Sequence, residues 1–63
     1  MDVGKVIREL REERGVSLRA LADASGVNFT TIRHIERGDN SPSVATLEKL
    51  LAALGAKIEI SRF

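Results

Sequence analysis

Residues 17–36 carry the pattern that most restricts how this chain can fold. Apolar residues recur there at helical spacing in two short runs, with residues 24–27 between them. Gly26 can take the positive φ that a tight turn between two helices requires. Ala22 is small where a second helix must cross closely, and Ile32 falls opposite it. The pattern predicts two short packed helices, with apolar positions at Leu18, Leu21, Ala22, Val27, Ile32 and Ile35.

In this arrangement the second helix projects from the surface of the domain, in an orientation suited to the DNA major groove. Any two short amphipathic helices would share part of the pattern. The small residue, the turn glycine and the branched residue in register favour a DNA-binding domain over that simpler interpretation.

The chain has 63 residues, no cysteine and a formal net charge of +1. That length predicts one domain, residues 1–63, near the lower limit of independent folding, so a subunit interface would stabilise it. Disulfides and thiolate zinc sites are excluded, and we expect no metal and no cofactor. Without a membrane-length apolar run or a signal peptide, we expect a cytoplasmic, nucleoid-associated protein with no membrane partner. The net charge does not decide on DNA, because a locally basic face can act within a neutral total.

Four residues stand where helix N-caps are expected, and glycines stand where three of the helices should end. The expected N-caps are Asp2, Ser17, Asn28 and Ser43, and the expected ends lie near Gly15, Gly38 and Gly55. The first helix should bury a stripe of Val3, Val6, Ile7 and Leu10. The last should bury Val44, Leu47, Leu50, Leu51 and Leu54.

Residues 56–61 alternate polar and apolar side chains, which predicts a half-buried strand. A lone strand after four helices leaves its N–H and C=O groups unpaired. Pairing with the same strand of a second copy would satisfy them and bury Ile58, Ile60 and Phe63. A frayed tail, a chain cut before a further domain, or docking on a partner protein are the alternatives.

The chain resembles the Cro/C1-type helix–turn–helix family, also called the XRE family, over residues 3–55. The resemblance is carried by Ser17-Leu18, Leu21-Ala22, Gly26-Val27, Thr31-Ile32, the run 35–38, Pro42-Ser43, Thr46-Leu47 and Leu50. It implies a mainly all-α, lambda-repressor-like domain of four or five helices, with its helix–turn–helix at residues 17–37. It also implies sequence-specific binding to operator DNA, usually as a dimer on an inverted repeat. Some members act mainly through protein contacts.

The helix after Asn28 would supply the base contacts, because its two isoleucines point inward and its other residues outward. Arg33 can form a bidentate pair with guanine, and Thr30 can offer a hydroxyl or a methyl group. Phe29 either packs on a thymine methyl or staples the start of the helix. His34 either donates to DNA or is neutral surface. The candidate base contacts are Phe29, Thr30, Arg33 and His34.

By resemblance, residues flanking that helix would contact phosphates. The candidates are Ser17, Arg19, Arg37, Asn40 and Ser43. Leu18 stands where the family often has a glutamine that touches phosphate, and Asp39 stands where a lysine or arginine is frequent. Both departures predict modest affinity per subunit and a shallow salt dependence, so that tight binding needs a dimer.

The resemblance also implies a structural brace between Arg11 and Glu36, placed behind the helix that reads DNA. The simpler alternative is a pair of solvated surface charges that contribute little.

The C-terminal stretch 54–60 is similar to the tail of antitoxin-type repressors, which pair such strands between subunits. We therefore expect a dimeric transcriptional repressor that binds double-stranded DNA, with a toxin as a further candidate partner and autoregulation of an operon as one role. The alternative is a protein-interaction module whose DNA binding is secondary. One histidine, no cysteine and no carboxylate pair beside an evident cleft argue against an enzyme.

Overall fold

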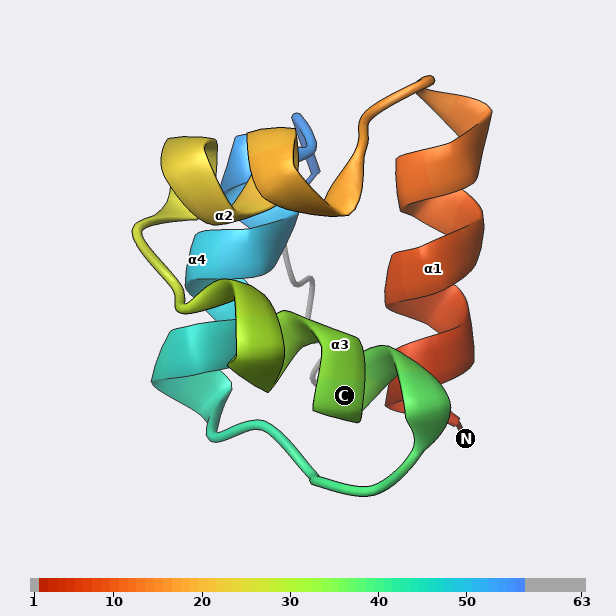
Figure 1. The fold of residues 1–63 in the computed structure, drawn as a ribbon, viewed down its shortest axis with the longest axis vertical. Helices are drawn as coiled ribbons and strands as arrows, with labels where there is room; N and C mark the ends of the chain where they lie inside the picture. Colours follow the sequence, from red (N-terminus) through yellow and green to blue (C-terminus); the bar gives the residue numbers. More distant parts are fainter. Residues whose placement is uncertain (1, 57–63) are drawn as a thin grey trace, which may run out of the picture.

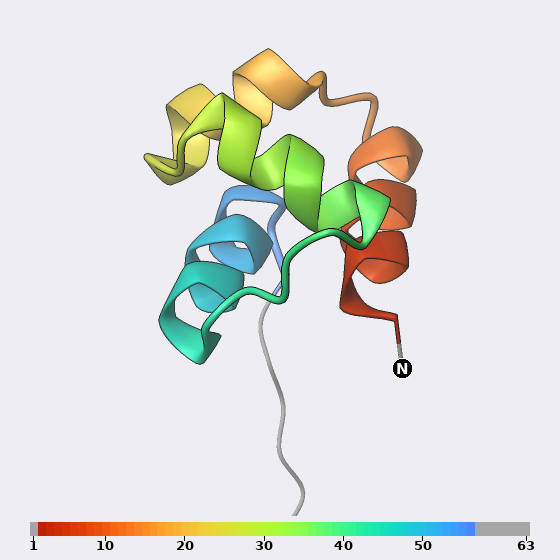
Figure 2. The same ribbon diagram turned by 60° about the horizontal axis from the view of Figure 1, so that its bottom comes forward.

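The computed structural model describes residues 2–56, which form four α-helices and their connections. The helices are α1 (Val3–Glu13), α2 (Leu18–Ser25), α3 (Phe29–Arg37) and α4 (Val44–Ala53) (Figure 1). α1 stands at one side, α2 and α4 lie at the other, and α3 runs between them (Figure 2). The described part of the chain is therefore all-α, as predicted, with four helices and no fifth within residues 2–56.

All four predicted N-caps are confirmed. In each case the side-chain oxygen accepts a hydrogen bond from a backbone N–H in the first turn, which would otherwise lack a partner. The acceptor–donor pairs are Asp2–Lys5 at 3.1 Å, Ser17–Ala20 at 3.0 Å, Asn28–Thr30 at 2.8 Å and Ser43–Thr46 at 3.1 Å.

Two glycines end the helices α2 and α3. Gly26 ends α2 with φ 74°, and Gly38 ends α3 with φ 83°, both in the left-handed region. After α3, the N–H of Gly38 bonds to the carbonyl of Ile35 and that of Asp39 bonds to the carbonyl of His34. This Schellman arrangement satisfies the last carbonyls of α3 and turns the chain toward α4.

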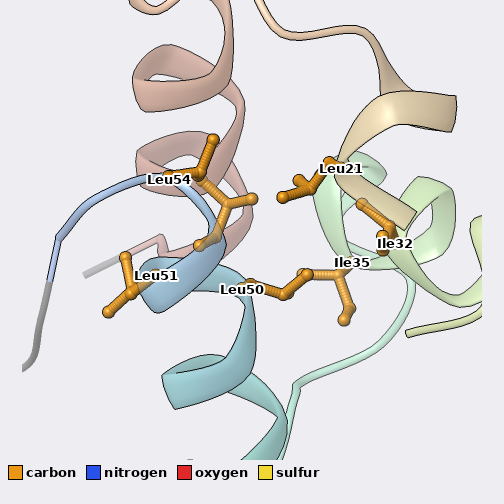
Figure 3. Packing of buried hydrophobic residues seen from close by; sticks show 7 residues of the cluster. Leu21, Ile32, Ile35, Leu50, Leu51 and Leu54 are labelled. Atoms are coloured by element: carbon orange, nitrogen blue, oxygen red, sulfur yellow. The ribbon is translucent and has the colours of Figure 1, made fainter. Parts of the chain in front are cut away.

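The hydrophobic core lies where the four helices meet (Figure 3). α1 packs on α3, and α2 packs on both α3 and α4. Burying each large apolar side chain stabilises the fold by roughly 1.5–3 kcal/mol. The buried residues are Ile7, Leu21, Ile32, Ile35, Leu50, Leu51 and Leu54.

Two predicted core residues are wrong. Val6 is 39% exposed and Val44 is 67% exposed. Val44 is the first residue of α4, one turn before Leu47, which packs against the core. Val6 is exposed because of how α1 packs on α3: the buried face of α1 is centred on Gly4 and Ile7 rather than on the valines. The buried face of α1 is therefore rotated away from Val6, compared with the predicted stripe.

At Gly4 the backbones of α1 and α3 approach each other closely. A Cβ atom at Gly4 would collide with the carbonyl oxygen of Ile35 and lie 3.3 Å from the Cα of Glu36. Both are backbone atoms of α3, so they cannot turn aside as a side-chain end can. Nothing in the local sequence pattern marks Gly4, because that pattern does not indicate which helix face will meet another backbone.

The predicted strand at residues 56–61 and the interface residues Ile58, Ile60 and Phe63 lie outside the described residues, apart from Ala56. The N–H of Ala56 bonds to the carbonyl of Leu51 at 2.7 Å and so completes the end of α4. Strand pairing between two copies stays a prediction. Among residues 2–56, no helix has the length and apolar character needed to cross a membrane.

Replacing Gly4 with alanine should destabilise the fold by about 1–3 kcal/mol, because α1 must move away from α3. Helix propensity alone would predict a gain from the same change. The free energy of unfolding in urea measures the difference. Lys5→Ala, at the exposed neighbouring position, is the control and should change stability little. Equal stability of Gly4→Ala and the wild type would contradict the close approach.

Candidate nucleic-acid interface

The outer face of α3 presents a row of polar side chains. Ile32 and Ile35 are buried in the core, which fixes the rotation of the helix about its axis. Thr30, Arg33 and Arg37 are exposed and follow one another at helical spacing on the opposite side. A helix that recognises DNA bases needs this arrangement, with an inner face held by packing and hydrogen-bond donors on the outer face.

Phe29 is partly buried at the start of α3 and already has a partner within the chain. The guanidinium carbon of Arg19, from α2, lies 5.5 Å from the centre of its ring. That distance is within the range of a cation–π contact, which contributes about 0.5–1 kcal/mol at an exposed site. The contact joins the first turns of α2 and α3, which supports the stapling interpretation while leaving part of the ring exposed.

Asp39 follows α3 and lies beside its last turn. Its Oδ2 is 3.4 Å from Nδ1 of His34 and 3.8 Å from Nε of Arg37. All three side chains are well exposed, so each pairing is worth at most about 1 kcal/mol. The carboxylate of Asp39 thus competes with any incoming phosphate for Arg37.

The remaining candidates lie at two helix starts and in the loop before α4. Oγ of Ser17 accepts from the N–H of Ala20, and its hydroxyl proton can still be donated to a phosphate. Oγ of Ser43 donates to Oγ1 of Thr46 at 3.0 Å, so the backbone N–H groups at the start of α4 are better placed to act there. Asn40 is exposed but lines a different hollow, beside the start of α1.

The packing of Leu18 accounts for a leucine at a position where the family often has a glutamine. Its side chain is partly buried and packs against the core, so it supports the fold where a glutamine would face a phosphate.

Arg11 and Glu36 form a bidentate ion pair between α1 and α3. Nε of Arg11 donates to Oε2 of Glu36 at 2.8 Å, and Nη2 donates to Oε1 at 3.0 Å. The side chains are only 14% and 6% exposed. The hydrogen bonds to Glu36 raise the pKa of Arg11 above its usual value, against the opposing effect of burial. A raised pKa in a cation means that its stabilising contribution is complete at any pH below the usual arginine value and is lost only above it.

Arg11 makes a third hydrogen bond, from Nη1 to the carbonyl of Val16 at 2.9 Å. Val16 immediately precedes Ser17, the N-cap of α2. One guanidinium therefore fixes α1, the end of α3 and the chain leading into α2. The sequence holds no signal for this contact, because its acceptor is a backbone carbonyl.

Replacing Arg11 with alanine should lower the free energy of unfolding by about 3 kcal/mol, because the nearly buried carboxylate of Glu36 loses its partner. A chain of this length has a total stability of only about 3–9 kcal/mol. Arg11→Lys, which keeps the charge but not the bidentate geometry, should therefore be measured alongside it. Lys5→Ala, which breaks an exposed pair on the same helix, is the control. Unchanged stability together with weaker DNA binding would instead assign Arg11 to the DNA contact.

A helix–turn–helix family model (HTH_3) matches residues 7–60 of the chain. The transcriptional regulator SutR of Escherichia coli K12 is 44% identical over 57 residues, which cover 90% of this chain and 31% of that protein. PuuR of the same organism, also a transcriptional regulator, is 38% identical over 55 residues, covering 87% and 30%.

The crystal structure of an HTH_3 family transcriptional regulator from Vibrio cholerae superposes with a TM-score of 0.86 at 39% identity, covering 89% of this chain and 32% of that one. The chain thus spans about a third of the length of these relatives. The family model extends over most of the chain and agrees with the four-helix arrangement. This chain therefore belongs to the Cro/C1-type (XRE) helix–turn–helix family.

Proposed function

We propose that this chain is a sequence-specific DNA-binding transcriptional regulator that acts as a dimeric repressor on an inverted-repeat operator. One observation carries the proposal: Thr30, Arg33 and Arg37 form an exposed row on a helix whose inner face and C-terminal end are both fixed. The names of the relatives, all transcriptional regulators, support it.

In this mechanism α3 enters the major groove and its N-terminal half reads the base edges. Arg33 donates two hydrogen bonds to a guanine, and Thr30 contacts a neighbouring base or phosphate. His34 and the exposed part of Phe29 lie at the margins of the same contact.

Phosphate contacts hold α3 in register. Ser17 and Arg19 act at the start of α2, Asn40 and Ser43 act before α4, and Arg37 acts at the end of α3. The N-termini of α2 and α4 add free backbone N–H groups and a partial positive charge. These contacts carry no sequence information, so base preference depends on α3.

Dimerisation follows from the small size of the surface that one copy offers. A single α3 reads one half-site, and two copies on an inverted repeat multiply their affinities through a high effective concentration. The alternating residues Ile58 and Ile60, followed by Phe63, support strand pairing as the link between copies. A regulator of this kind works in the cytoplasm, at the nucleoid.

The alternative, a module that binds a toxin through its C-terminal segment, rests on the same alternation at Ile58 and Ile60. The row on α3 has no role in that alternative. The two functions therefore separate in an experiment on Arg33.

Selection of bound duplexes from a random pool should enrich an inverted repeat whose half-sites lie about one helical turn apart. Arg33→Ala should relax the preference at one base pair of each half-site, at a cost of about 1–3 kcal/mol in binding. Arg14→Ala is the matched control, because Arg14 is exposed and its Nε lies near Gly55, after the end of α4.

An unchanged preference in Arg33→Ala would remove Arg33 from the base contacts. A wild type that selects no motif would contradict the proposed function and favour the interaction module.

Asp39→Asn should tighten binding to the selected duplex by roughly two- to fivefold and steepen its salt dependence, because Arg37 is released and a repelling charge is removed. The preferred sequence should not change. Glu48→Gln, an equal change of charge at an exposed position on α4, is the control. Measured affinities at several salt concentrations decide the matter, and the same effect from both variants would show that only net charge counts.

A further inference from the structure

A shallow hollow lies between α1 and the outer face of α3. The end of α3 packs against α1 (Figure 1). Arg33 and Arg37 line it from α3, and Arg8 lines it from α1. Leu18 and the Arg11–Glu36 pair complete most of the lining. The exposed row on α3 that we propose to contact DNA therefore has a neighbouring basic residue on α1, Arg8.

The charge in this hollow is predominantly positive. Glu36 neutralises Arg11 through two short hydrogen bonds, which leaves three exposed arginines around the hollow. Two carboxylates oppose them: Glu12, in the lining, lies 3.7 Å from Nε of Arg8, and Asp39, outside the lining, lies 3.8 Å from Nε of Arg37. Both side chains of the Arg8–Glu12 pair are more than half exposed, so the pairing is weak and Arg8 can exchange it for another anion.

We propose that Arg8 binds the DNA phosphate backbone beside α3, so that α1 forms part of the DNA-binding surface. The inference rests on the proposed function. When Arg33 reaches a base edge, the phosphates flanking the groove lie alongside the same hollow, within reach of a long guanidinium side chain. Glu12 is then an internal competitor, which holds Arg8 in the free protein and lowers its net gain on binding.

The helix α1 supplies its own matched control. Lys5 and Glu9 form the same kind of exposed pair one turn earlier, with Nζ 3.9 Å from Oε1. Lys5 does not line the hollow. Removing Lys5 deletes the same charge from the same helix, so any difference between the two variants reports position rather than net charge.

The test compares Arg8→Ala with Lys5→Ala in binding to the duplex selected by the wild type and to a scrambled duplex. We expect Arg8→Ala to weaken binding to both duplexes by roughly three- to tenfold. The slope of log affinity against log salt should fall by about 1, the loss of one phosphate contact. Lys5→Ala should keep the wild-type slope. Thermal melting of both variants should match the wild type, since each breaks only an exposed pair.

A second comparison approaches the same contact from the opposite side. Glu12→Gln should tighten binding by releasing Arg8, whereas Glu9→Gln should have a smaller effect. If Arg8→Ala and Lys5→Ala behave alike, or if Glu12→Gln does no more than Glu9→Gln, the contact is overturned while the proposed function stands. If the wild type selects no duplex, the proposed function fails and the contact fails with it.

Discussion

The hydrogen bonds that Glu36 accepts from Arg11 hold the helix that presents the candidate DNA contacts. The same guanidinium donates to the carbonyl of Val16, so one side chain joins α1, the end of α3 and the entrance to α2. A bidentate pair that is nearly buried fixes distance and angle together, which a single apolar contact does not. Burying the charges costs desolvation energy that the geometry must offset, so the pair specifies position more than it adds stability.

Two contacts hold α1 on α3: a close backbone approach at one end of the buried face of α1 and an ion pair at the other end. Gly4 brings α1 against the carbonyl of Ile35, and Arg11 pairs with Glu36 two turns later. Ile7 lies between them and is fully buried. The three contacts leave α1 little freedom to slide or rotate on α3, and α3 in turn keeps Thr30, Arg33 and Arg37 facing outward.

The chain is nearly neutral overall, but three of its exposed arginines lie together beside α3. One arginine pairs with Glu36 inside the protein, and two of the exposed arginines near α3, Arg8 and Arg37, stand beside carboxylates that hold them only weakly. Glu12 and Asp39 are each within 4 Å of a candidate DNA-binding arginine. In the proposed complex, these pairs lower the affinity of both arginines for phosphate. In that proposed complex, base readout by α3 then contributes a larger share of the total binding energy than it would on a strongly basic domain.

The sequence by itself determined where each described helix begins and where three of them end, because a cap such as Ser17 bonds to backbone only three residues away. It also determined which face of α3 is buried, since Ile32 and Ile35 fix that face by periodicity. Tertiary structure decided the rest: the rotation of α1 that exposes Val6, the hydrogen bond from Arg11 to Val16, and the hollow that joins Arg8 to α3. These features depend on how closely segments distant in sequence approach one another, and no local pattern of residues encodes that distance.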